Sequence, residues 1–241
     1  MPLTLLKEGK EKNMNQFKTT SLADQVFEKL ENDIIQGVYP RGEILTELKL
    51  VDQLGVMEIQ LAQKLGVSRT PIREALRRLE QERLIEDTGK GSRVVGITEE
   101  DLEDIMNIRQ RIEGLAAYYA TKNMTPEGLA QLTHIADLQD FYFDKGDAEL
   151  LRQGDEQFHD TICYLSKRTV IVDTLLPLHR KTRRYRRISM EDWSRTINTR
   201  KEHRAILDAM ASGNADLAES LMAKHIENAK KHMLGGFKNH G

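Results

Sequence analysis

Apolar residues recur at helical spacing from residue 98 to about residue 234, and this stretch of roughly 140 residues contains no convincing strand. Turn signals divide it into six helices. The first begins at Thr98-Glu99-Glu100-Asp101, which resembles a capping box, and the second at Thr125-Pro126-Glu127, which supplies an N-cap and a first-turn proline. Helices without a sheet bury their apolar stripes against one another. The pattern therefore predicts a mainly α protein with a C-terminal bundle of six or seven helices.

Turn residues also set the later boundaries. Gly146-Asp147 separates the second helix from the third, and one helix is expected over residues 169–187. Gly213-Asn214 closes the penultimate helix and starts the last one, which is expected to end near Leu234 and to leave 236–241 as a tail. Residues 1–18 are polar and Lys-rich without a clear period, which is typical of a disordered arm.

The composition excludes several classes of protein. With 36 basic and 38 acidic residues, the formal net charge of −2 does not by itself indicate a nucleic-acid partner. No apolar run approaches the roughly 20 residues that a membrane span needs, and the N-terminus lacks the apolar segment of a signal peptide. Cys163 is the single cysteine, so no internal disulfide can form and the reducing cytoplasm is the expected location.

Residues 61–80 have the pattern of a helix-turn-helix. A short apolar-faced helix ends near Leu65, Gly66 supplies the turn, and Ser68 or Thr70 caps a second helix. The second helix has a buried face of Ile72, Ala75, Leu76 and Leu79. A different face carries an arginine stripe at a spacing of four, formed by Arg69, Arg73 and Arg77. A helix held by its apolar side and presenting arginines can enter the major groove of DNA.

A hairpin pattern follows at residues 84–95. Two short β-like runs flank Gly89-Lys90-Gly91, which predicts a wing whose Lys90 and Arg93 can contact phosphates or a minor groove. The alternative is an arginine-rich solvated helix followed by a loop.

Four residues of the C-terminal half could bind a metal ion. Asp155 and His159 lie four residues apart on one helix face, His203 lies on the penultimate helix and His225 on the last. Bundles build metal sites from facing helices. Each histidine could equally be a buried or exposed structural residue, and Asp155 and His159 could be an ordinary helix pair.

The remaining histidines lack such companions, and we expect surface or tail positions for His134, His179, His232 and His240. A basic cluster surrounds Tyr185. We expect it to be mostly a solvated face from which one side chain could reach a pocket; its members are Arg183, Arg184, Arg186 and Arg187.

The helix-turn-helix closely resembles that of the GntR family of bacterial transcription regulators, through the run Gly-Val-Ser-Arg-Thr-Pro-Ile-Arg-Glu-Ala-Leu-Arg-Arg-Leu-Glu at residues 66–80. Residues 25–37 look like its first helix, and residues 39–45 like the loop that follows. The resemblance implies a winged helix-turn-helix domain over residues 19–97, in which Arg69 and Arg73 read bases while Ser68 and Thr70 hold phosphates. The wing tip, with Lys90 and Gly91, would assist.

One feature departs from the family pattern. Leu50-Val51-Asp52-Gln53-Leu54-Gly55-Val56 is nearly repeated as Leu61-Ala62-Gln63-Lys64-Leu65-Gly66-Val67. Only the second copy precedes Ser-Arg-Thr-Pro, so we place the reading helix there. The first copy is expected to form an extra helical turn or to extend a helix before the motif.

The C-terminal half resembles the FCD domain, the ligand-binding domain of the FadR-type branch of GntR regulators. Residues 108–117 match its opening helix, and Asp155-x-x-Phe158-His159, Glu202-His203-x-x-Ile206 and Met222-x-x-His225 match its metal motifs. For a domain over residues 98–235, the resemblance implies that Asp155, His159, His203 and His225 are the ligands of a divalent transition metal. Zn²⁺ is the first choice, and Ni²⁺ or Mn²⁺ are alternatives.

Arg109 is the matching arginine of the opening helix. It could clamp the carboxylate of a small organic acid bound at open metal positions. The alternative is a surface arginine paired with Glu113, four residues later.

These expectations describe a ligand-responsive transcriptional regulator, a repressor, and not an enzyme. A homodimer would place two reading helices on a pseudo-palindromic operator in double-stranded DNA, and no membrane is involved. The alternatives are a metal-dependent hydrolase that uses the same residues, although no HExxH motif is present, and a regulator whose metal is only structural.

Overall fold

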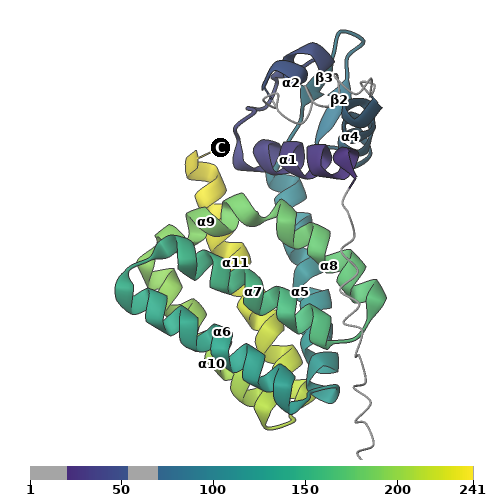
Figure 1. Ribbon diagram of the computed structural model, residues 1–241. Coiled ribbons are helices and arrows are strands. Elements are labelled where there is room, and N and C mark those ends of the chain that lie inside the picture. Colours follow the sequence, from purple (N-terminus) through teal and green to yellow (C-terminus); the bar gives the residue numbers. More distant parts are fainter. Residues whose placement is uncertain (1–20, 54–69, 241) are drawn as a thin grey trace, which may run out of the picture.

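The computed structural model describes residues 21–53 and 70–240, in which a small domain of helices and short strands sits on a larger all-helical domain (Figure 1). The mainly α fold is confirmed. The expected arm at 1–18 and most of the near-repeat at 50–67 lie outside the described residues. Ile97, on the connection between the domains, packs against the hydrophobic cores of both.

The N-terminal domain is built on two packed helices, α1 (Leu22–Gln36) and α4 (Thr70–Gln81). Ser21 and Asp24 form a capping box at the start of α1, which ends at Gly37 with a φ of +78°. The apolar face predicted for α4 is buried at Ile72, Ala75 and Leu79, where it joins the core of the domain. A short helix, α2 (Glu47–Gln53), contacts α4.

The predicted wing is present as β2 (Ile85–Asp87) and β3 (Ser92–Val94), which pair antiparallel with Glu86 opposite Arg93. A third strand, β1 (Ile44–Leu45), pairs with β3 and gives the sheet order β1-β3-β2. The sequence suggested only a loop at residues 39–45, because a two-residue strand is too short to show any alternation of apolar and polar residues.

Seven helices form the C-terminal domain, all of whose residues from 98 to 240 are described. Thr98 and Asp101 make the predicted capping box, and Thr125 caps the next helix with Pro126 in its first turn. The helices are α5 (Glu99–Lys122), α6 (Pro126–Lys145), α7 (Ala148–Leu165), α8 (Thr169–Lys181), α9 (Arg183–Glu191), α10 (Trp193–Ala211) and α11 (Ala215–His240).

Two predicted helix ends are wrong. The single helix expected over 169–187 is divided at Thr182, whose ψ of 1° leaves the helical range and whose hydroxyl donates to the carbonyl oxygens of Leu178 and His179. The expected tail at 236–241 is replaced by helix as far as His240, because a glycine costs a helix only about 1 kcal/mol and does not forbid its geometry.

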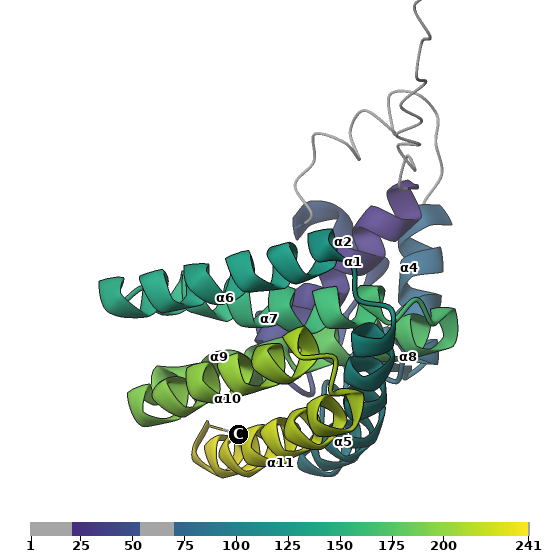
Figure 2. The same ribbon diagram turned by 90° about the horizontal axis from the view of Figure 1, so that it is seen from below.

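The longest helices of the bundle pack closely in pairs. Helix α5 packs along α11, α6 along α7, and α10 along α11 (Figure 2). At Gly114 of α5, an added Cβ would lie 3.1 Å from the carbonyl oxygen of Glu219, so the absence of a side chain allows α11 to approach closely. The core contains Phe158 and Met222, both fully buried. Among the described residues, no helix combines the length and the hydropathy of a membrane span.

Candidate metal centre and DNA-reading surface

Three helices bring four potential metal ligands together inside the bundle. Asp155 and His159 project from α7, His203 from α10 and His225 from α11, and all four side chains are buried. One donor atom from each lies within 4.8 Å of the others. The Nε2 atom of His225 is 3.2 Å from that of His159 and 3.3 Å from that of His203. The cluster predicted from four separate motif positions is therefore present.

The orientation of each imidazole is fixed by an acceptor at its other nitrogen. Nδ1 of His159 lies 2.6 Å from Glu113 Oε2, Nδ1 of His203 lies 3.0 Å from Gln139 Oε1, and Nδ1 of His225 lies 2.7 Å from Glu202 Oε2. We assign the hydrogen to Nδ1 in each ring, because carboxylate and amide oxygens accept. The three Nε2 lone pairs then face one another.

This arrangement fits a cation. Facing lone pairs repel each other, and a positive ion between them removes the repulsion. A tetrahedral ion about 2.0–2.1 Å from its nitrogens would hold them about 3.3 Å apart, which matches the two Nε2 separations. Imidazoles that donate their second N–H to carboxylates or carbonyls are typical of metal centres. Asp155 Oδ1 lies slightly farther out, at 3.6 Å from His203 Nε2 and 3.9 Å from His159 Nε2.

The electrostatics favour the protonation states that a metal requires. Burial lowers the pKa of His159 to about 4, although Glu113 acts in the opposite direction. Burial likewise holds the pKa of His203 well below its ordinary value. Burial alone would raise the pKa of Asp155, but the Arg186 guanidinium and the neighbouring imidazoles lower it. The neutral imidazoles of His159 and His203 therefore face an ionised carboxylate near neutral pH.

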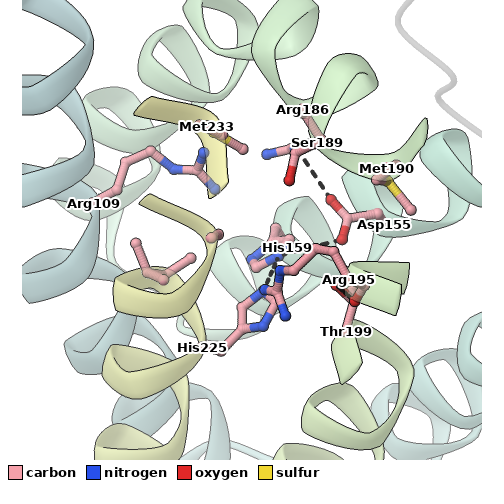
Figure 3. A pocket seen from close by; sticks show the side chains of 12 residues that line it. Arg109, Asp155, His159, Arg186, Ser189, Met190, Arg195, Thr199, His225 and Met233 are labelled. Atoms are coloured by element: carbon pink, nitrogen blue, oxygen red, sulfur yellow. Dashed lines mark hydrogen bonds and ion pairs between the residues drawn. The ribbon is translucent and has the colours of Figure 1, made fainter. Parts of the chain in front are cut away.

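A small cavity adjoins the cluster, with a volume of about 20 Å³. Three arginines line it, Arg109 from α5, Arg186 from α9 and Arg195 from α10, together with Asp155 and His225 (Figure 3). A cavity of this volume has room for about one water molecule.

Arg109 lies at the wall of this cavity. The alternative of a surface position is wrong, because the residue is 1% exposed. The expected pairing with Glu113 is present as well, since Arg109 Nε donates to Glu113 Oε1 at 2.6 Å. Arg109 Nη1 also donates to the hydroxyl of Thr182 at 2.9 Å.

His179 corrects the sequence prediction of a surface histidine. It is buried on α8, with Nε2 3.0 Å from Glu113 Oε1 and Nδ1 2.6 Å from Asp160 Oδ1. Each ring nitrogen of His179 therefore faces a carboxylate oxygen. Its partner Glu113 is 66 residues away in the sequence, so no local pattern indicated the contact.

Several residues around the cluster were not predicted as functional. Arg186 is the member of the basic cluster that reaches the pocket, where its Nε lies 3.1 Å from Asp155 Oδ2. Arg195 is buried beside Glu202 at 2.8 Å. The sequence signal for Glu202 was its position next to His203 in the metal motif, whereas Gln139 had none.

Two arginines of α4, Arg73 and Arg77, are exposed to solvent. Arg73 of α4 has a side chain that is 65% exposed and pairs with Glu47 of α2 at 2.7 Å. Together with Arg77, Lys90 and Gly91 it lines a surface groove of about 520 Å³ between α4, β1 and the wing. Thr70 begins α4. Ser68 and Arg69 lie outside the described residues.

Comparisons with known proteins agree with both halves of this description. The model of the GntR family of bacterial regulatory proteins matches residues 22–95, and that of the FCD domain matches residues 104–228. The chain is 28% identical to the HTH-type transcriptional regulator YdhC of Bacillus subtilis, over 92% of this chain and 90% of YdhC.

Two further relatives extend the comparison. The chain is 26% identical to a probable D-xylose utilization operon transcriptional repressor of Paenarthrobacter nicotinovorans, over 90% of this chain and 92% of that protein. The solved structure of Escherichia coli McbR has the same fold, with a TM-score of 0.68 at 21% identity, and the match covers 92% of this chain and 99% of McbR. The chain belongs to the GntR family of bacterial transcriptional regulators and combines the family's DNA-binding domain with an FCD domain.

Proposed function

We propose that this regulator is a repressor that senses a small carboxylate metabolite at a metal centre and changes its affinity for operator DNA in response. The observation that carries the proposal is the convergence of three imidazole Nε2 atoms and one carboxylate beside an arginine-lined cavity. Neither a structural core nor a solvated surface requires that combination of groups.

In this proposal Asp155, His159, His203 and His225 hold a divalent transition metal, Zn²⁺ first and Ni²⁺ or Mn²⁺ as alternatives. A metal held there would act as a Lewis acid toward a carboxylate oxygen of the ligand. Arg109 is the clamp for the same carboxylate, because its planar guanidinium matches a carboxylate and it already lies at the cavity wall.

Helices α8 and α9 would transmit the effect of the ligand to the DNA-binding domain. Arg180 Nε donates to Glu31 of α1 at 3.1 Å, and Lys181 Nζ to Glu82, just after α4, at 2.5 Å. These bonds lie next to Thr182, the partner of Arg109. A ligand that moves Arg109 would thus act on the connection to α1, with a typical coupling of ~1–3 kcal/mol.

The protein would bind double-stranded operator DNA as a cytoplasmic homodimer. Arg69 and Arg73 would read bases, Ser68 and Thr70 would hold phosphates, and the wing tip with Lys90 and Gly91 would assist. A dimer is supported by two large apolar side chains seven residues apart on α5, Ile108 and Leu115, which are 43% and 37% exposed in the single chain.

The test begins with selection of binding sites from a pool of random DNA duplexes. The affinity for the selected site is then measured with a panel of small carboxylic acids, in zinc-loaded and in chelator-treated protein. We expect at least one acid to change the affinity and to raise the melting temperature only when metal is present.

Three other results would count against the proposal. Consumption of an acid would indicate a metal-dependent hydrolase. Bound metal without stabilisation by any acid would indicate a purely structural metal. Failure to select any DNA sequence would contradict the operator-reading role.

A further inference from the structure

A buried guanidinium whose two terminal nitrogens lack acceptors lies at the wall of the cavity. Arg186 is 3% exposed, and both its Nη1 and Nη2 atoms are buried with no hydrogen-bond partner. Its Nε pairs with Asp155. An arginine cannot relieve such burial by losing its proton, so its two free nitrogens require an acceptor from elsewhere.

The other two arginines of the cavity are already balanced. Arg109 is paired with Glu113 at 2.6 Å, and Arg195 with Glu202 at 2.8 Å. Arg186, by contrast, has only Asp155, which also faces the imidazole cluster at 3.6 Å from His203 Nε2. One carboxylate is therefore shared by a guanidinium and by the candidate metal ligands.

Because Asp155 is shared in this way, the charges around the candidate metal centre do not cancel. A divalent cation and Arg186 bring three positive charges against the single negative charge of Asp155, while the imidazoles are neutral. The cavity is then left with an excess of two positive charges. A monocarboxylate balances only half of that excess, whereas a dicarboxylate balances all of it.

We infer that the effector is a dicarboxylate, one end of which lies at the metal and Arg109 while the other accepts hydrogen bonds from Nη1 and Nη2 of Arg186. The inference rests on the proposed function and adds the chemical class of the ligand. A carboxylate fits the two terminal nitrogens of a guanidinium with two parallel hydrogen bonds. The hydroxyl of Ser189, one turn beyond Arg186 on α9, lines the same cavity and offers a further donor (Figure 3).

The cavity of about 20 Å³ must widen to hold such a ligand, and α9 supplies Arg186 and Ser189 to its wall. Helix α9 also contacts α1 of the DNA-binding domain, where the guanidinium of Arg184 lies against Gly37. Binding at Arg186 would therefore displace the helix that supports the DNA-binding domain.

The experiment compares acids matched in carbon number on the zinc-loaded full-length protein by isothermal titration calorimetry. The pairs are propionate and malonate, butyrate and succinate, and valerate and glutarate. We expect at least one diacid to bind about 10- to 100-fold more tightly than its monoacid partner, the range for a charge-assisted pair of hydrogen bonds. Arg186→Gln should abolish that preference and leave monoacid binding in place.

Arg187→Gln is the matched control, because Arg187 is the exposed neighbour on the same helix and should keep the preference. Arg186→Lys keeps the positive charge but lacks the planar pair of nitrogens. It should retain only part of the preference for diacids. Zinc content, measured in each variant, shows that the metal centre is intact. If Arg186→Gln does not fold, the wild-type pairs and Arg186→Lys still decide the matter.

Equal binding of diacids and monoacids by the wild type would overturn the inference and leave carboxylate sensing intact. A preference for diacids that persists in zinc-loaded Arg186→Gln would also overturn the inference and leave carboxylate sensing intact. If no acid of any pair binds the zinc-loaded wild type, carboxylate sensing itself is wrong and the inference fails with it.

Discussion

The hydroxyl of Tyr185 donates a hydrogen bond to the backbone carbonyl oxygen of Ile97 at 3.2 Å. Tyr185 lies on α9 beside Arg186, and Ile97 lies on the connection between the two domains. Three successive residues of α9 thus contact three different places, since Arg184 faces Gly37 of the α1 end, Tyr185 the connection and Arg186 the cavity. This short helix therefore contacts both the cavity and the DNA-binding domain.

Tyr185→Phe removes that hydrogen bond and keeps the buried ring. We expect ligand binding to be unchanged, while the ratio of DNA affinities with and without ligand narrows about fivefold, as the loss of about 1 kcal/mol of coupling implies. Fluorescence anisotropy with a selected duplex measures the ratio. Tyr164→Phe is the control, because Tyr164 is 58% exposed. If the ratio is unchanged in Tyr185→Phe, the hydrogen bond from Tyr185 to Ile97 does not couple ligand binding to DNA binding.

Glu202→Gln tests how the metal ligands are held. Glu202 Oε2 accepts from His225 Nδ1 at 2.7 Å, and the loss of its charge makes the imidazole a weaker ligand. We expect zinc affinity, measured in competition with a chromophoric chelator, to fall about 10- to 100-fold. Glu227→Gln removes a partly exposed carboxylate of α11, the helix that carries His225, and should have no effect. Equal affinity in the two variants would indicate that Glu202 does not support the metal.

The metal-free protein should lose stability as the pH falls. The pKa of His159 is lowered to about 4 in the folded state, so between its ordinary value near 6.5 and about 4 the unfolded chain binds a proton that the folded chain does not. The free energy of unfolding therefore decreases as the pH falls through that window, by on the order of 2–3 kcal/mol for this residue alone. Urea unfolding at pH 7, 6 and 5 measures the decrease. In His159→Gln the free energy of unfolding should depend less on pH. If that dependence is unchanged in the variant, other groups cause the decrease.

Arg73→Ala tests the reading surface. If Arg73 contacts a guanine edge, its loss costs ~1–3 kcal/mol of DNA affinity and relaxes the preference at one base pair. The same result is expected for Arg69→Ala. Lys201→Ala, at an exposed position of α10, is the control. A uniform loss across all sequences would instead place Arg73 at a phosphate.

Phe158→Ala tests the support of the site by the core. Phe158 is fully buried, and its ring stacks on His203 with centroids 4.2 Å apart. Removing the ring should lower the free energy of unfolding by about 3–5 kcal/mol. Phe141→Ala, at a position that is 53% exposed, should cost far less. Similar losses in the two variants would contradict the packing described here.

Local sequence signals predicted much of the fold because they act over a few residues. The capping boxes, the wing and the apolar face of α4 each depend on side chains within one or two turns. The break at Thr182 and the strand β1 were missed because the first depends on a backbone bend within an apolar pattern, and the second on pairing with β3, nearly 50 residues away.

The candidate site divides in the same way. The four ligand positions could be named because each belongs to a short motif, and the resemblance to a known domain connected the motifs. The buried state of His179 and the place of Arg186 at the cavity could not be predicted, since both depend on how α8 and α9 pack against α7. Periodicity shows which helix faces are apolar, but it does not show which charged side chain is enclosed.

The size of the cavity has a kinetic consequence. The cavity must widen before an acid larger than a water molecule can occupy it, so we expect the frequency of this widening to slow association. Release of the acid depends on the same movement. A response controlled in this way would ignore brief fluctuations of metabolite concentration and follow only sustained ones.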